Sequence, residues 1–156
     1  MLRTLDRIKA ADEAWLSNPE IFMVNKLDAH SDHMYYEDKD AMYGDEMPLR
    51  QSLNGTWKIN YAVNIEASDR EFYKEDRDAT LYDDIKVPGH MELQGFGRCQ
   101  YINTMYPWEG SEDLRPPHIP REDAPVGCYV RYFDINPELA GKRTFISFQG
   151  VENAFY

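Results

Sequence analysis

Apolar residues near the start of the chain recur every three to four positions, the spacing of one face of a helix. The set is Leu2, Leu5, Ile8, Ala11 and Trp15. Asn18 and Pro19 follow, and a proline inside a helix removes a backbone hydrogen bond, so the helix should end there. We therefore predict a short amphipathic helix at the N-terminus.

Further along, the period changes from helical to alternating. Residues 57–63 place Trp57, Ile59, Tyr61 and Val63 on one side and polar or small residues on the other, as a half-buried strand does. A brief strand at 85–87 should stop at Pro88. The apolar run at 128–135 is the strongest strand signal, and 143–149 follows after a turn. These segments predict a mainly β fold, a sandwich or jelly roll.

The number of strands bears on the completeness of that fold. A sandwich needs about seven or eight strands to cover both sheets, and four or five are credible here. The final residues, Ala154, Phe155 and Tyr156, begin another apolar stretch. We therefore expect a domain that is truncated at its C-terminus.

Residues 87–108, the aromatic loop, have neither a helical nor a strand period. They contain three glycines, two prolines and four aromatic residues. Aromatic-rich loops of this length usually pack and serve a binding surface. Asn103 lies between Tyr101 and Tyr106, and a sugar offers C–H faces to rings and hydroxyls to amides. Residue type alone favours a loop amide that satisfies backbone groups for Asn103, and packing for Tyr106 and Trp108.

Composition narrows the classes of function. The 156 residues carry a net charge of −11 and show no basic stripe, which argues against nucleic acid as a partner. Cys99 and Cys128 have no metal-ligand spacing, and His30 and His33 have no fixed geometry, so we expect no metal site and reduced thiols. There is no signal-peptide core and no apolar run of about 18 residues. We expect a cytoplasmic protein without a membrane partner.

Ordered motifs over nearly the whole chain resemble the N-terminal sugar-binding domain of bacterial β-galactosidases of glycoside hydrolase family 2. They include the preamble Asn25-Lys26-Leu27 with Ala29-His30-Ser31, and the loop motif Tyr101, Asn103, Tyr106 and Pro107. Other members of the series are Ser52-Leu53-Asn54-Gly55 with Trp57, Gln94-Gly95-Phe96-Gly97, and Phe148, Gly150, Val151, Asn153, Ala154 and Phe155. The preamble and the loop favour a β-galactosidase over the β-glucuronidases and β-mannosidases of the same family.

The resemblance implies a galactose-binding-like jelly-roll sandwich at 51–156 and an N-terminal segment at 1–50 that makes subunit contacts. It implies a retaining glycosidase whose two catalytic glutamates and magnesium ligands lie in a (β/α)8 barrel beyond residue 156. Mg²⁺, and Na⁺ as a second ion, then belong to the complete enzyme and no cofactor to this chain. No catalytic residue is expected here, and the chain alone should be inactive.

The resemblance also assigns the substrate contacts. Asn103 should hydrogen-bond the galactosyl group, Thr104 should form pocket wall, and Tyr101 is the third candidate. Thr104 departs from the apolar residue expected at that position. The expected partners are a β-galactoside, the remaining domains of the enzyme and further copies in a homo-oligomer. Two alternatives stay open: a stand-alone carbohydrate-binding module, and a structural or interaction domain without hydrolase activity.

Overall fold

The computed structural model describes residues 12–44, 47–99, 103, 108–109, 112–152 and 154–156. Backbone contacts group the chain into two compact units. The first, the terminal unit, comprises Met1–Gln51, Pro116–His118 and Ile135–Tyr156. The second, the sheet unit, comprises Ser52–Arg115 and Ile119–Asp134. The predicted domain division at residue 50 stays a prediction.

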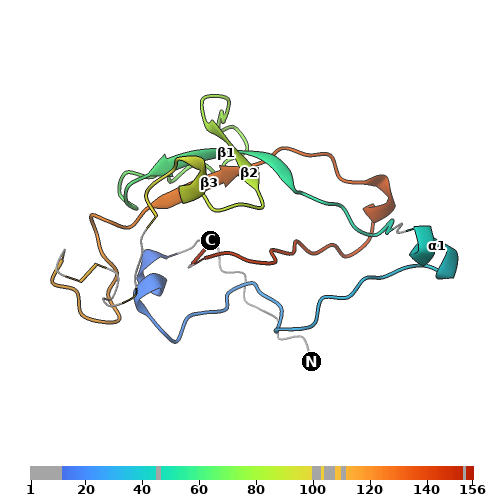
Figure 1. Cartoon of the computed structure of the whole chain (residues 1–156), viewed down its shortest axis with the longest axis horizontal. Helices are drawn as coiled ribbons and strands as arrows, with labels where there is room; N and C mark the ends of the chain where they lie inside the picture. Colours follow the sequence, from blue (N-terminus) through green and yellow to red (C-terminus); the bar gives the residue numbers. More distant parts are fainter. Residues whose placement is uncertain (1–11, 45–46, 100–102, 104–107, 110–111, 153) are drawn as a thin grey trace. The chain divides into compact units, whose positions relative to one another are not determined.

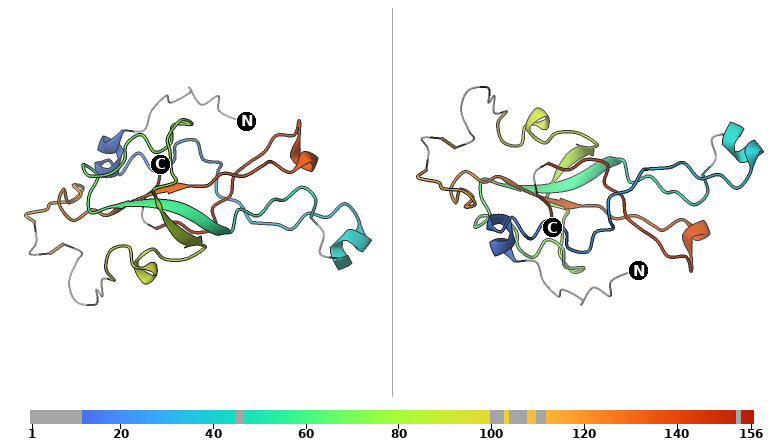
Figure 2. Two further views of the ribbon diagram at one scale, coloured as in Figure 1. Left: turned by 90° about the horizontal axis from the view of Figure 1, so that it is seen from above. Right: turned by 90° about the horizontal axis from the view of Figure 1, so that it is seen from below.

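The sheet unit is built on three antiparallel strands in the order β2-β1-β3, with β1 (Gly55–Ala62) in the centre (Figures 1 and 2). β2 (Asp83–Val87) pairs with β1 so that Trp57 faces Ile85, and β3 (Val126–Val130) pairs so that Asn60 faces Cys128. The prediction of a mainly β fold is confirmed. The jelly-roll, galactose-binding-like sandwich stays a prediction.

The core of the sheet unit follows from this register. Ile59 of β1 and Ile85 of β2 are fully buried, with 0% and 1% of their surface exposed, and Cys128 of β3 is 2% exposed. Ala62 is buried at the end of β1, whereas Val63 is 58% exposed. The prediction that Val63 extends the buried face is wrong, because β1 ends at Ala62 and Val63 lies in the bend that follows.

Residues 64–82 form a series of turns that contact one face of the sheet. The Lys58 ammonium donates to the Tyr82 carbonyl at 3.1 Å, and the Tyr132 phenol donates to the Arg77 carbonyl at 3.1 Å. The Cys128 thiol lies 3.6 Å from the Asp69 carbonyl. Lys58 and Cys128 share a face because the side chains of paired strands alternate. The turns therefore cover the face that Ile59 does not occupy.

In the terminal unit, the short 3₁₀ helix η1 (Glu13–Ser17) is capped by Asp12, whose carboxylate accepts from the Ala14 amide at 2.9 Å. It ends at Asn18, before Pro19, as predicted. The other residues of the predicted N-terminal helix, up to Ala11, lie outside the described residues. A six-residue helix, α1 (Lys39–Gly44), lies where the sequence gave no helical signal, and the Asp38 carboxylate caps it through the Ala41 amide at 2.9 Å.

The later strands differ from the prediction. β3 begins at Val126 and ends at Val130, whereas the predicted strand ran over 128–135. The predicted strand at 143–149 is wrong, because these residues are extended but belong to no ladder in the described part of the chain. A strand requires a hydrogen-bonded neighbour, and the side chains of Phe145, Ile146 and Phe148 remain about half exposed. The 3₁₀ helix η3 (Pro137–Leu139) precedes residues 143–149 in the chain. Another 3₁₀ helix, η2 (Glu92–Gln94), follows β2.

Candidate functional site

The aromatic loop begins at the end of β2 and carries the predicted sugar contacts. Of these, the structure describes Asn103, whose side chain is exposed. Tyr101 and Thr104 lie outside the described residues, as does Tyr106. The geometry of the candidate site is therefore that of the described residues on either side of Asn103. We call residues 94–98 the first stem and residues 108–109 and 112 the second stem, and both belong to the sheet unit.

The first stem is held against β2 by one side chain. The amide of Gln94 accepts from the Lys86 backbone N–H at 2.7 Å and donates to the Lys86 carbonyl at 3.0 Å. This pair of bonds reproduces what a neighbouring strand would make with Lys86. Gln94 therefore satisfies the backbone N–H and carbonyl of Lys86 on the outer edge of β2, and it fixes where the loop leaves the sheet.

Phe96 and Gly97, further along the first stem, pack on the Tyr61 side chain of β1. The rings of Phe96 and Tyr61 lie 6.3 Å apart between centroids. Gly97 has a φ of +84°, and a Cβ atom there would lie 3.1 Å from the Tyr61 hydroxyl oxygen. A residue with a side chain is disfavoured at such a φ and would also crowd the phenol. Glycine is therefore strongly favoured where the stem packs on the Tyr61 side chain.

The end of the first stem and the start of the second meet at the segment before β3. The Arg98 guanidinium pairs with the Asp123 carboxylate at 2.7 Å, and the Trp108 indole N–H donates to the Asp123 carbonyl at 2.7 Å. The Glu112 carboxylate accepts from the backbone amides of Arg121 and Glu122 at 3.1 and 3.2 Å. We call residues 121–123 the anchor segment. Pro120, immediately before it, is fully buried.

This arrangement allows binding chemistry at Asn103. An exposed carboxamide offers two N–H donors and one carbonyl acceptor, and it does not titrate. Two acidic side chains near the loop stems bond other groups of the sheet unit. Glu112 is bonded to two backbone amides, and Asp84 lies in β2, not in a loop, with its carboxylate 2.8 Å from the Lys58 ammonium. These carboxylates stabilise the fold.

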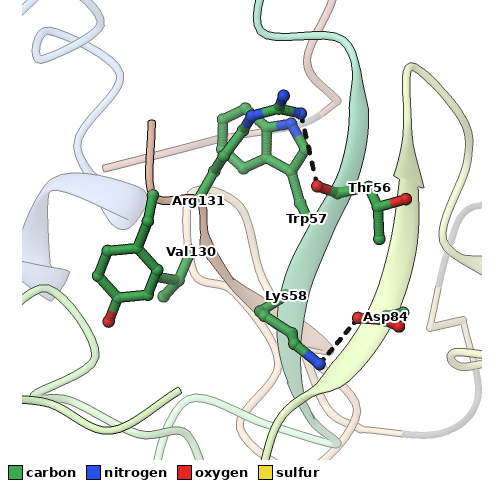
Figure 3. Close-up of a pocket in the computed structure, with 7 residues that line it drawn as sticks. Thr56, Trp57, Lys58, Asp84, Val130 and Arg131 are labelled. Carbon is green, nitrogen blue, oxygen red and sulfur yellow. Dashed lines mark hydrogen bonds and ion pairs between the residues drawn. The ribbon is translucent and has the colours of Figure 1, made fainter. Parts of the chain in front are cut away.

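A second feature is a hollow of about 210 Å³ on the sheet (Figure 3). Lys58 of β1 reaches Asp84 of β2, and Arg131 lies over the Trp57 ring with its guanidinium carbon 5.9 Å from the centroid. One nitrogen of Arg131 donates to the Leu53 and Asn54 carbonyls at 2.9 and 3.1 Å. The hollow is lined by Thr56, Trp57, Lys58, Asp84, Val130, Arg131 and Tyr132.

The charged groups of this hollow bond one another or the backbone. These residues therefore stabilise the fold and are not part of the candidate site. Among the described residues, no group of three or more His, Cys, Asp or Glu side chains lies close enough together to hold a metal ion. The same part of the chain contains no helix that is long and apolar enough to span a membrane.

Comparison with known protein families matches residues 50–156 to the glycosyl hydrolases family 2, sugar binding domain. The chain belongs to this family. The resemblance predicted from the ordered motifs is thereby confirmed. The aromatic loop, its two stems and the anchor segment all lie inside the matched range.

Several bacterial β-galactosidases are similar to this family 2 chain over most of its length. A β-galactosidase of Clostridium acetobutylicum is 57% identical over 143 residues, which cover 91% of this chain and 16% of that protein. One from Halalkalibacterium halodurans is 54% identical over 144 residues, covering 92% and 14%. The β-galactosidase large subunit of Leuconostoc lactis is 44% identical over 158 residues, covering 94% and 25%. The chain thus spans a quarter or less of these relatives.

The sequence pattern did not indicate which residues bond the two stems to the anchor segment. Arg98 and Asp123 are separated by 25 positions, and neither stands out among 17 basic and 28 acidic residues. The tryptophan at 108 was expected to pack, and its indole N–H is indeed bonded to backbone in a partly buried position. The Gln94-Gly95-Phe96-Gly97 motif was noted from the sequence, and the structure supplies its physical role.

Proposed function

We propose that this chain is the sugar-binding part of a retaining β-galactosidase that hydrolyses terminal β-D-galactosyl residues, as in lactose. In this proposal Asn103 contributes an edge of the substrate pocket, with Thr104 and Tyr101 beside it. The catalytic glutamates are carried by a barrel beyond residue 156. The 156-residue chain is therefore inactive by itself.

The observation that carries the proposal is the exposed Asn103 amide, in a loop whose first stem bonds to Lys86 of β2 and to Asp123 of the anchor segment. Support also comes from the relatives of this chain, which are β-galactosidases. One hydrogen bond contributes only about 0.5–1.5 kcal/mol net. A single amide is too weak to hold a sugar alone, so the remaining contacts come from other parts of the enzyme.

The same proposal covers the partners. In the proposal, the rest of the enzyme supplies the Mg²⁺ site, with Na⁺ as a second ion. Residues 1–50 make subunit contacts in a homo-oligomer, and the complete enzyme acts in the cytoplasm. Several relatives are named large subunits, which supports assembly from more than one piece.

A complementation assay tests the proposal. The chain is mixed with a family 2 β-galactosidase that lacks the corresponding segment, and hydrolysis of a nitrophenyl β-galactoside is followed for the mixture and for each component. We expect activity in the mixture alone. Asn103→Ala should lower kcat/KM of the mixture by about two- to tenfold, because one hydrogen bond to the sugar is lost.

Leu93→Ala is the matched control, since Leu93 belongs to the same loop and is 75% exposed. It should leave kcat/KM of the mixture unchanged. Hydrolysis by the chain alone would refute the claim that the catalytic groups lie elsewhere. Unchanged kinetics for Asn103→Ala would refute the assignment of the sugar contact.

A structural or interaction role is a second candidate, and one observation favours it. The terminal unit exposes aromatic side chains near its end: Phe148 and Phe155 contact each other at 5.4 Å between ring centroids, yet each remains about half exposed. Exposed apolar side chains in contact with one another are typical of surfaces that bind protein. This role is compatible with the first.

A further inference from the structure

The outer edge of β2 is occupied by a side chain instead of a strand. In the described sheet, β2 pairs with β1 on one side and with no strand on the other (Figure 1). The Lys86 backbone N–H and carbonyl point to that open side, where the Gln94 amide bonds both, at 2.7 and 3.0 Å. An unpaired edge strand is a template for a further strand, and native proteins block such edges.

The length of the available edge follows from the alternation of the ladder. Backbone groups that point to the same side recur at every second residue, so Asp84 shares this edge with Lys86. The edge ends on both sides of this pair. The Tyr82 carbonyl already accepts from the Lys58 ammonium at 3.1 Å, and Pro88 has no N–H. A further strand would therefore find its hydrogen-bonding partners at Asp84 and Lys86.

The charges of this edge favour one partner, β2 of a second copy of this chain. If two copies pair antiparallel about Ile85, Lys86 of each lies opposite Asp84 of the other, with the backbone groups of both directed at the partner. Opposite charges that face each other across a ladder are favourable, and like charges are unfavourable. The present bonds of these side chains, to Lys58 and Thr56, leave both of them exposed. The edge is therefore complementary to itself.

The position of Gln94 on this edge is fixed locally. Gln94 is the last residue of η2, and its Nε2 atom also donates to the His90 carbonyl at 3.4 Å. Gly89 leaves room for the amide, since a Cβ there would lie 2.7 Å from the same Nε2 atom. A contact that short would force the Gln94 side chain to move. Occupation of the edge therefore depends on both Gln94 and Gly89.

We propose that the Gln94 side chain closes the outer edge of β2 against antiparallel pairing with β2 of a second copy of this chain. Removal of the amide exposes the N–H and carbonyl of Lys86 and completes a self-complementary patch, which is the requirement for a two-fold dimer. This edge lies outside residues 1–50, to which the proposed function assigns the subunit contacts. The inference is also independent of the sugar contact.

The alternative is a purely local role, in which Gln94 fastens the first stem to β2 and has no effect on association. The two roles differ in how protein concentration acts once the amide is removed. Under a local role, the Lys86 N–H of the variant stays unprotected at every concentration. Under the proposed role, the N–H regains protection as chains pair, because the Asp84 carbonyl of the second copy replaces Gln94 as its acceptor.

The test is hydrogen exchange of the ¹⁵N-labelled full chain and its Gln94→Ala variant. At low concentration, the Lys86 N–H of the variant should exchange at least about fivefold faster than in wild type, because its acceptor is lost. The Ile85 N–H, which points to β1, should be unaffected. Raising the concentration from about 50 µM to about 1 mM, the range of weak and small interfaces, should slow the Lys86 exchange of the variant again and increase its sedimentation coefficient. Wild-type Lys86 exchange should be independent of concentration.

Three further variants test the edge by other routes. Gly89→Ala displaces the amide without changing Gln94, and it should reproduce both the faster exchange and its concentration dependence. Lys86→Glu combined with Gln94→Ala places two carboxylates opposite each other, so the fast exchange at residue 86 should persist at every concentration. Leu93→Ala is the matched control, because Leu93 lies in η2 next to Gln94 and is 75% exposed. It should behave as wild type.

Three results would overturn the inference. Unchanged Lys86 exchange in dilute Gln94→Ala would mean that the amide does not occupy the edge. Exchange that stays fast in Gln94→Ala up to the highest concentration would mean that no second copy pairs there. Concentration-dependent protection that survives the added Lys86→Glu change would mean that the chains pair in another register or through another surface.

Discussion

The Arg77 guanidinium donates to one carboxylate oxygen of Asp69 through two nitrogens, Nε at 2.6 Å and Nη2 at 2.5 Å. The Tyr82 phenol donates to the same oxygen. The Asp69 carbonyl, in turn, accepts from the Cys128 thiol of β3 at 3.6 Å. Asp69 therefore joins the beginning and the end of the turns at 64–82 and ties them to the sheet.

These contacts predict a pH-dependent stability. The hydrogen bond from the Tyr82 phenol, together with Arg77, lowers the pKa of Asp69 below its ordinary value. A carboxyl whose pKa is lowered on folding stabilises the protein above its unfolded pKa, and the contribution is lost as pH falls through the folded value. Asp69→Asn should therefore lower the Tm at neutral pH, and its difference from wild type should shrink below about pH 4. Thermal unfolding followed by circular dichroism at a series of pH values measures this.

Asp76→Asn serves as the control, because Asp76 lies in the same turns and is exposed. Its Tm should match wild type throughout the series. An Asp69→Asn variant with an unchanged Tm at neutral pH would show that Asp69 does not hold the turns.

Gly97 and Gly95 provide a matched pair for the first stem. Both have positive φ, +84° and +95°, but a Cβ on Gly97 would meet the Tyr61 hydroxyl at 3.1 Å, whereas one on Gly95 would meet nothing within 4 Å. Alanine should cost about 1–2 kcal/mol at each position from backbone strain. We expect Gly97→Ala to cost about 1 kcal/mol more than Gly95→Ala, because the phenol must also shift. Urea unfolding of the two variants measures the difference.

The Tyr61→Phe background isolates the cause. Without the hydroxyl, the nearest Tyr61 atoms to that Cβ would lie at 3.5 Å, an ordinary contact distance. The two alanine variants should then become equal in stability. A difference that persists in this background would contradict the packing of Gly97 against the phenol.

The two cysteines should differ in reactivity. Cys99 is exposed and Cys128 is buried, and burial raises the pKa of the Cys128 thiol. The thiolate is the reactive form, so Cys128 should react with a thiol reagent more than about tenfold slower than Cys99 in the folded chain. Mass spectrometry of the alkylated protein over time, with and without denaturant, measures both rates.

A Cys99→Ser variant completes that experiment. It should lose the fast phase of alkylation and keep the slow one, and denaturant should bring Cys128 to the rate of an exposed thiol. Rapid alkylation of Cys128 in the folded variant would mean that β3 does not shield it.

Alternation of apolar residues located β1, an apolar run located β3, and Pro88 located the end of β2, because these signals act within a few neighbouring residues. The prediction failed at 143–149, where a strand is expected from the sequence and no ladder forms in the described part of the chain. A strand exists only with a hydrogen-bonded neighbour, and that neighbour is not encoded in the segment itself. The exposed Val63 has a similar explanation, since the end of β1 is set by its pairing with β3.

For the candidate site, the composition of residues 87–108 was enough to single out the loop, and the resemblance to the family singled out Asn103 within it. It did not indicate Arg98 or Asp123 as partners. An ion pair depends on two charges meeting in space, and many other pairs were equally available among the charged residues of this chain. The stems therefore emerged only from the folded structure.

By itself, the sequence determined the membership in the family, the mainly β class and the position of the aromatic loop. These properties depend on residue types and on their order along the chain. Only the tertiary structure showed that Gly97 packs against the Tyr61 hydroxyl and that the Asp69 carboxylate bonds both Arg77 and Tyr82. It alone showed that Asp123 bonds both Arg98 and Trp108. Each of these is a contact between residues that are distant in sequence, and folding alone brings such residues within bonding distance.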